Sequence, residues 1–167
     1  MAQAAHILGL ILLEQGQLDD AAIVFERIRE DALGSGLSST SGAPNTSMKT
    51  TSQEIALLSA LVWDSTVNLA HSRLLQGRMT EAAAGYLACA KSSPVELTGA
   101  YVRGTAIQSS RADLDHWRAR ALHGAGEASG ATRAIASAIH MRPDHQLLRW
   151  HCITPGHHHS LDCASML

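Results

Sequence analysis

Histidine and cysteine, the residue types that most often bind zinc, gather near the end of the chain. They are His151, Cys152, His157, His158, His159 and Cys163. Known zinc sites pair their ligands at short, fixed spacings on a structured scaffold. This segment has neither such pairs nor apolar periodicity, so we predict that residues 152–167 form a frayed tail and that the chain binds no metal or other cofactor. An enzyme or metalloprotein that uses this tail is the alternative.

Acid–base chemistry could also come from Asp113, Asp115 and His116, which lie close together in the sequence. On a helix, however, these three side chains do not converge as an acid–base pair. The sequence also lacks a nucleophile elbow, a phosphate-binding loop and a paired carboxylate motif. We therefore predict that the chain is not an enzyme.

A recurring spacing of glycine, alanine and a large apolar residue predicts the elements of the fold. The three sets are Gly16, Ala21 and Phe25; Gly77, Ala82 and Tyr86; and Gly126, Ala131 and Ile135, and prolines close the last two at Pro94 and Pro143. Glycine ends a first helix in the left-handed conformation, and alanine lets a second helix cross it closely. The large residue fills the space beside this crossing, and proline stops the second helix. These offsets are typical of tetratricopeptide (TPR) helix–turn–helix repeats.

We therefore expect an all-α fold of TPR-type helical hairpins, stacked over residues 1–151 as a right-handed superhelix, or α-solenoid. The expected repeats span residues 2–33, 53–94 and 111–143, and a partial repeat begins at residue 144. Residues 34–52, rich in Ser, Thr and Gly, are expected to form a loop insertion. Residues 94–110 are a second insertion.

The first helices of such a stack line its concave face, and their side chains are the predicted partner-binding residues. These are Gln3, His6, Leu10, Asp64, Asn68, His71, Leu75, Asp113, His116 and Arg120. One interpretation is a groove for an extended or helical peptide. The other is a solvated polar face that binds nothing in particular. Because three of these residues are histidines, the affinity of a groove would change between about pH 5 and pH 7.

Chaperone adaptors built from such repeats hold a partner's terminal carboxylates with Lys, Asn and Arg side chains from successive first helices. Only Asn68 fits this pattern, and Asp113 would repel a carboxylate, so the sequence disfavours this use. The tryptophans Trp63, Trp117 and Trp150 are expected in the core between repeats. An exposed tryptophan would instead be a candidate interface anchor.

The composition fits packed helices and disfavours several classes of partner. Apolar residues make up 46% of the chain and aromatic residues only 4%, as expected of helices that pack through Ala and Leu. The formal net charge of -2 at pH 7 is unlike that of a direct nucleic-acid binder. No apolar stretch approaches the ~20 residues of a membrane span. We therefore expect protein partners, with neither nucleic acid nor membrane.

Three segments resemble successive repeats of the large TPR subunit of the polymerase-associated factor (PAF) complex. They are FERIREDA, VNLAHSRLLQGRMTEAAAGYLACAKSS and RARALHGAGEASGATRAIASAIHMRPDH, in this order. The most specific match is the run Asn68–His71, because a repeat of that family opens with the same four residue types. Phe25 with Arg29 and Glu30, and the run Arg118–Leu122, resemble the repeats before and after it.

This resemblance implies a nuclear scaffold that acts in transcription elongation and supports co-transcriptional histone modification. Its implied partners are the other PAF-complex subunits and RNA polymerase II. The alternative is a general TPR adaptor outside transcription, in a chaperone or trafficking assembly, located in the cytoplasm.

Overall fold

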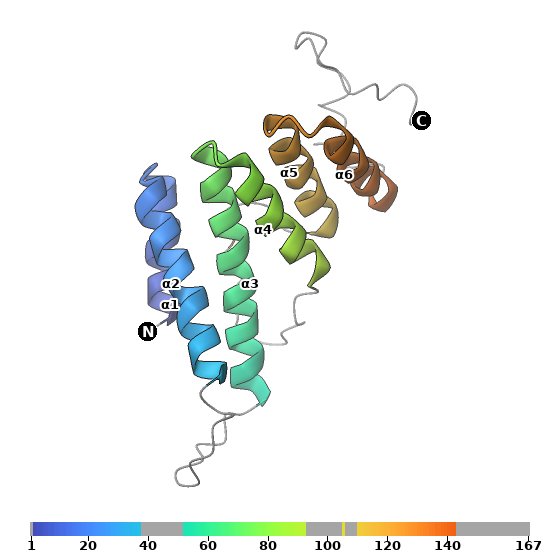
Figure 1. The fold of residues 1–167 in the computed structure, drawn as a ribbon. Helices are drawn as coiled ribbons and strands as arrows, with labels where there is room; N and C mark the ends of the chain where they lie inside the picture. Colours follow the sequence, from blue (N-terminus) through green and yellow to red (C-terminus); the bar gives the residue numbers. More distant parts are fainter. Residues whose placement is uncertain (1, 38–51, 93–104, 106–109, 143–167) are drawn as a thin grey trace, which may run out of the picture.

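The computed structural model of the chain describes residues 2–37, 52–92, 105 and 110–142 (Figure 1). These residues form an all-α structure. The helices are α1 (Ala2–Glu14), α2 (Leu18–Leu37), α3 (Ser52–Leu75), α4 (Met79–Lys91), α5 (Arg111–Gly124) and α6 (Ala128–Met141). Pro94, Pro143, Trp150, the partial repeat from residue 144 and the tail at 152–167 lie outside the described residues. No helix in the described ranges is both long enough and apolar enough to cross a membrane.

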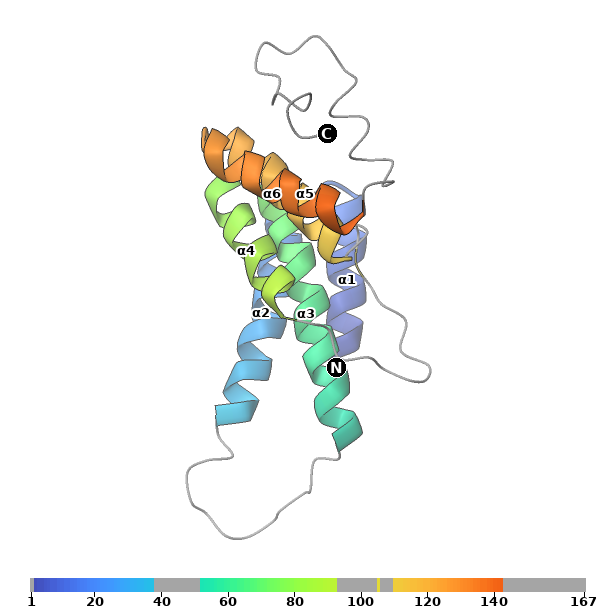
Figure 2. The same ribbon diagram turned by 90° about the vertical axis from the view of Figure 1, so that its right-hand side faces the viewer.

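Each helix packs mainly against the helices that precede and follow it in the chain, and α1 also contacts α3. Tight joints connect α1 to α2, α3 to α4, and α5 to α6, so the helices form three consecutive pairs. Figure 1 shows these pairs side by side, and Figure 2 shows α3 between α2 and α1 at the centre of the molecule.

The three joints have the same backbone geometry. Gly16, Gly77 and Gly126 have φ angles of 74°, 79° and 80°, in the left-handed region where a Cβ is costly. In the first joint, Gly16 N donates to Leu13 O at 3.1 Å and Gln17 N donates to Leu12 O at 2.9 Å. Equivalent bonds of 2.8–3.1 Å close the other two joints. This is the Schellman pattern, which satisfies the last carbonyl groups of the first helix.

The three pairs also share a small residue two turns before the joint glycine, a position absent from the predicted packing residues. It is occupied by Gly9, Ala70 and Ala119, all of them buried. A Cβ on Gly9 would come within 2.7 Å of Phe25 Cε1. In the second pair the glycine lies on the second helix instead of the first. A Cβ on Gly85 would come within 2.8 Å of Ala70 Cβ. Small residues therefore let the helices of these pairs approach closely.

The alanines and large apolar residues among the predicted packing residues lie in the interior, whereas the three joint glycines are exposed. Ala21, Phe25, Ala82, Tyr86, Ala131 and Ile135 are each at most 4% exposed. The core consists of two hydrophobic clusters, one formed by α1, α2 and α3 and the other by α3 to α6. Helix α3 contributes Leu61 and Leu69 to the first cluster and Val67 and Leu74 to the second. Both clusters therefore depend on this one helix.

One predicted boundary is wrong. The loop insertion was expected to begin at residue 34, but α2 continues to Leu37. Gly34 and Gly36 each disfavour a helix by about 1 kcal/mol. Extending an existing helix adds a hydrogen bond for each residue that is fixed, and α2 packs along α3. The first four residues of the predicted loop, 34–37, therefore belong to α2.

Candidate functional site

The ten predicted partner-binding residues lie on α1, α3 and α5, and they differ in exposure. Gln3, Leu75 and Arg120 are exposed, whereas Leu10 and His71 are half-buried. The other five, His6, Asp64, Asn68, Asp113 and His116, are at most 4% exposed. The prediction that these five line an open groove is corrected accordingly, because their side chains contribute to internal contacts.

His6 and Asn68 take part in polar contacts between α1 and α3. The Nδ1 atom of His6 lies 3.0 Å from Ser65 Oγ, and its Nε2 atom lies 3.5 Å from Asn68 Nδ2. The His6 ring also meets Phe25 edge-on, with the ring centroids 5.5 Å apart. Polar groups in an interior are nearly always hydrogen-bonded, and these bonds hold the first helices of two neighbouring pairs together.

Asp113 and Asp115 stabilise the hairpin of α5 and α6. Ser110 and Asp113 form a capping box at the start of α5, in which Ser110 N donates to Asp113 Oδ2 at 3.1 Å. Asp115 Oδ2 accepts a hydrogen bond of 2.8 Å from Ser137 Oγ on α6. The two carboxylates thus have separate structural contacts, and the ring of neighbouring His116 meets Trp117 edge-on.

An aromatic and cationic cluster that joins α3 to α5 remains partly accessible. It consists of His71, Trp117 and Arg120, and we call it the His–Trp–Arg cluster. The His71 and Trp117 rings meet edge-on with their centroids 5.3 Å apart. The Arg120 guanidinium carbon lies 5.4 Å from the Trp117 ring centroid, within the range of a cation–π contact. Trp117 is half-buried and packs against the larger core cluster.

The buried residue Tyr86 supports this cluster through a contact with His71. Its hydroxyl lies 3.2 Å from His71 Nδ1, and burial raises the tyrosine pKa well above its ordinary value. Burial, and secondly the charge of Arg120, lower the pKa of His71. The imidazole is therefore neutral near pH 7, and it can both donate and accept a hydrogen bond.

Trp63 has a different environment, because it lies in the core at 7% exposure. Its Nε1 group donates to the carbonyl oxygens of Cys89 at 3.2 Å and Ser92 at 3.1 Å. It thereby satisfies carbonyl groups at the end of α4 that the helix itself leaves unpaired. Trp63 is a structural residue, and Trp117 is the candidate anchor.

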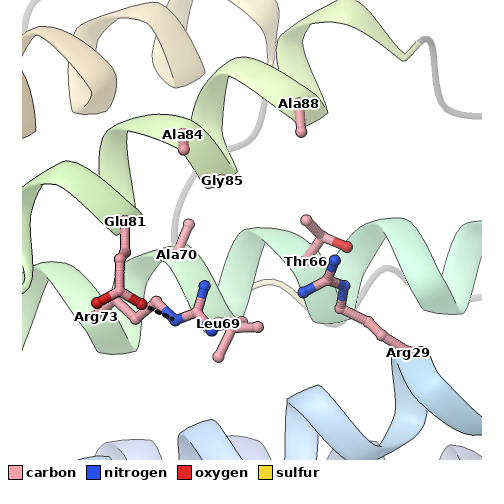
Figure 3. A pocket seen from close by; sticks show the side chains of 9 residues that line it. All are labelled: Arg29, Thr66, Leu69, Ala70, Arg73, Glu81, Ala84, Gly85 and Ala88. Carbon is pink, nitrogen blue, oxygen red and sulfur yellow. Dashed lines mark ion pairs between the residues drawn. The ribbon is translucent and has the colours of Figure 1, made fainter.

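A pocket opens on the other side of α3, between α2 and α4 (Figure 3). It has a volume of about 280 Å³ and contains the side chains of Arg29 and Arg73. Neither arginine was among the predicted binding residues. The repeat pattern directs attention to the first helices, and it gave no signal for a cavity beside the second helices.

Comparison with protein-family models, curated proteins and solved structures finds no match to this chain. The residues that the structure describes include no group of three or more His, Cys, Asp and Glu side chains that could hold a metal ion. The histidines and cysteines of the predicted tail lie outside these residues.

Proposed function

We propose that this chain is a protein-interaction scaffold, which binds a partner along the face shared by α1, α3 and α5. The observation that supports it best is the His–Trp–Arg cluster, where aromatic and cationic side chains remain partly accessible. Tryptophan and arginine are enriched among residues that dominate the binding energy of protein interfaces. Leu10 and Leu75 supply further apolar surface on the same face.

The cluster suits a partner with a planar or acidic group. Trp117 offers a rigid apolar ring, and the exposed guanidinium of Arg120 lies against it. A guanidinium held against a ring loses little side-chain freedom when it binds, since its position is already fixed. Neutral His71, whose Nδ1 is bonded to the Tyr86 hydroxyl, adds one further hydrogen-bonding nitrogen, Nε2, at the edge of the ring.

Arg120→Glu tests this proposal, with Arg111→Glu as the matched control on the same helix. Both arginines are exposed, so both variants are expected to fold, which circular dichroism can verify. Tagged wild-type protein and both variants would be purified from the native cells, and bound proteins compared by quantitative mass spectrometry. Partners that the wild type and Arg111→Glu retain but Arg120→Glu loses are expected. Identical sets for all three proteins would contradict binding through this face.

The finer proposal is that the partners belong to the PAF transcription elongation complex. It rests on the resemblance of the three segments around Phe25, Asn68–His71 and Arg118–Leu122 to that family. Recovery of RNA polymerase II with elongation subunits, and nuclear localisation of the tagged protein, are the expected results. Recovery of chaperone or trafficking proteins from the cytoplasm, without polymerase, would favour the general TPR adaptor instead.

A further inference from the structure

The pocket between α2 and α4 shares no residue with the His–Trp–Arg cluster. We propose that it binds a single acidic side chain, Glu or Asp, of a partner peptide. The proposal extends beyond the scaffold function, because it assigns a second binding site to another face of the molecule.

The two sites use opposite faces of α3. Thr66, Ala70 and Arg73 line the pocket, and their spacing of three or four residues places them along one face of the helix. Asn68 and His71 lie about half a turn away from that row, given 3.6 residues per turn. A ligand in the pocket therefore leaves the His–Trp–Arg cluster free.

Small residues on α4 create the space. Beyond Glu81, the wall on this side consists of Ala84, Gly85 and Ala88, which carry no side chain larger than a methyl group (Figure 3). Gly85 rests closely on Ala70, whereas Ala84 and Ala88 are exposed. Leu69 adds a buried apolar surface on the α3 side.

One end of the pocket is closed by ion pairs. Arg73 binds Glu26 of α2 at 3.0 Å and Glu81 of α4 at 3.5 Å. Glu81 is also paired with Arg78 at 2.6 Å. The charges of Arg73 and Glu81 are therefore compensated within the protein. The pairs of Arg73 link α2, α3 and α4 around the pocket.

Arg29 lies at the other end and has no such partner. Within the described part of the chain it forms neither an ion pair nor a hydrogen bond, although it is half-buried. Figure 3 shows its guanidinium directed toward Thr66. The Thr66 hydroxyl donates to Val62 O at 2.7 Å. The donors of Arg29 are therefore available to a ligand.

The chemistry of Arg29 and the size of the pocket identify the ligand class. A guanidinium matches a carboxylate with two parallel hydrogen bonds. The volume of about 280 Å³ lies just below the range of about 300–1,000 Å³ typical of drug-sized ligands. It suits one side chain, whose methylene groups would contact Leu69 and Ala88 while the carboxylate reaches Arg29. A cationic side chain would be repelled by Arg29.

Nuclear magnetic resonance titration tests this inference on the full chain. The probe is the blocked tripeptide N-acetyl-leucyl-glutamyl-leucine amide, and its neutral counterpart carries glutamine in place of glutamate. The glutamate peptide is expected to bind in the millimolar range and to shift the Gly85 amide and the Ala84 and Ala88 methyl signals. Arg29→Gln should weaken this binding by about tenfold, since a charge-assisted pair contributes on the order of 1.5 kcal/mol or more.

Two further variants make the result decisive. Arg27→Gln removes the same charge from an exposed position of α2 outside the pocket, so it should bind like the wild type. Ala88→Leu fills the pocket from an exposed helical position and should abolish binding without unfolding the chain. Equal binding of the two peptides, unchanged binding by Arg29→Gln, or no shift at Gly85 at millimolar concentrations would overturn the proposal. Binding unaffected by Ala88→Leu would place the peptide elsewhere and overturn it as well.

Discussion

Three histidines on the first helices of their pairs, His6, His71 and His116, have different environments. His6 and His116 are buried, whereas His71 is half-buried beside Trp117. Helical spacing predicts the face on which each ring lies. It does not predict which rings are covered, because that depends on long-range contacts such as the one between His6 and Ser65.

The His71 pKa should respond to Arg120 in a predictable direction. Burial and the Arg120 charge both lower it from the ordinary value of 6.5. In Arg120→Gln the pKa should rise toward 6.5, since the repulsion between two cations disappears. Arg111→Gln, on the same helix, should leave it unchanged. Resonances of the imidazole ring followed against pH would measure this, and an unchanged pKa in Arg120→Gln would refute the assigned cause.

The same shift gives a direction for stability. The folded chain holds a His71 whose pKa lies below that of the unfolded chain, so the unfolded state binds the proton more readily. The contribution of neutral His71 to folding stability is therefore complete above about pH 6.5. It is lost as the pH falls through the pKa that His71 has in the folded chain. Urea unfolding across this range should show a smaller loss for His71→Gln than for the wild type. Equal losses would mean that other groups carry the pH dependence.

The Cys89 thiol should be unreactive in the folded protein. It is 2% exposed, and burial raises its pKa to about 12. The thiolate is the reactive form, so iodoacetamide near pH 8 should label Cys89 only after the protein is unfolded in urea. Peptide mass spectrometry would locate the label, and the urea-treated sample serves as the positive control. Rapid labelling of Cys89 in the native protein would contradict its placement in the core.

At the scale of the helix, features that depend on local backbone chemistry could be predicted from sequence. The glycines at 16, 77 and 126 need a left-handed conformation, and the alanines and large residues after them follow at fixed distances. The end of α2 and the small residue Gly9 could not be predicted in this way. The first depends on packing along α3, and the second depends on the position of the Phe25 ring.

Two helical glycines provide a matched test of this difference. Gly9→Ala should destabilise the protein by about 1–3 kcal/mol through overpacking, because its Cβ would meet the Phe25 ring at 2.7 Å. Gly34→Ala on α2 has open space around it and should stabilise by up to about 1 kcal/mol through helix propensity. Chemical denaturation measures both. Equal changes in the two variants would show that α1 does not pack closely on Phe25.

At the scale of the whole molecule, the interior is divided into two clusters that both include α3. The all-α class and the order of the helices follow from the repeated spacing. The candidate sites are harder to predict from the sequence, because the His–Trp–Arg cluster joins two helices and the pocket joins three. Neither arrangement leaves a pattern within a single stretch of sequence.

Local stability should follow the two clusters. Phe25→Ala removes a fully buried ring and should cost about 3–5 kcal/mol, mostly as faster hydrogen exchange in α1 and α2. Ile135→Ala should increase exchange mainly in α5 and α6, because Ile135 belongs to the other cluster. Native-state hydrogen exchange measured by mass spectrometry separates these regions. A uniform increase over all helices in both variants would instead indicate a single cooperative unit.

The sharing of α3 also has a mechanical consequence. Helix α2 belongs to one cluster and α4 to the other, and the pocket with Arg29 lies between them. If the clusters flex against each other, α3 is the axis, and the width of the pocket changes with the angle of bending. A ligand bound in the pocket would limit this bending and make the molecule stiffer. The ion pairs of Arg73 with Glu26 and Glu81 already limit it at the other end of the pocket.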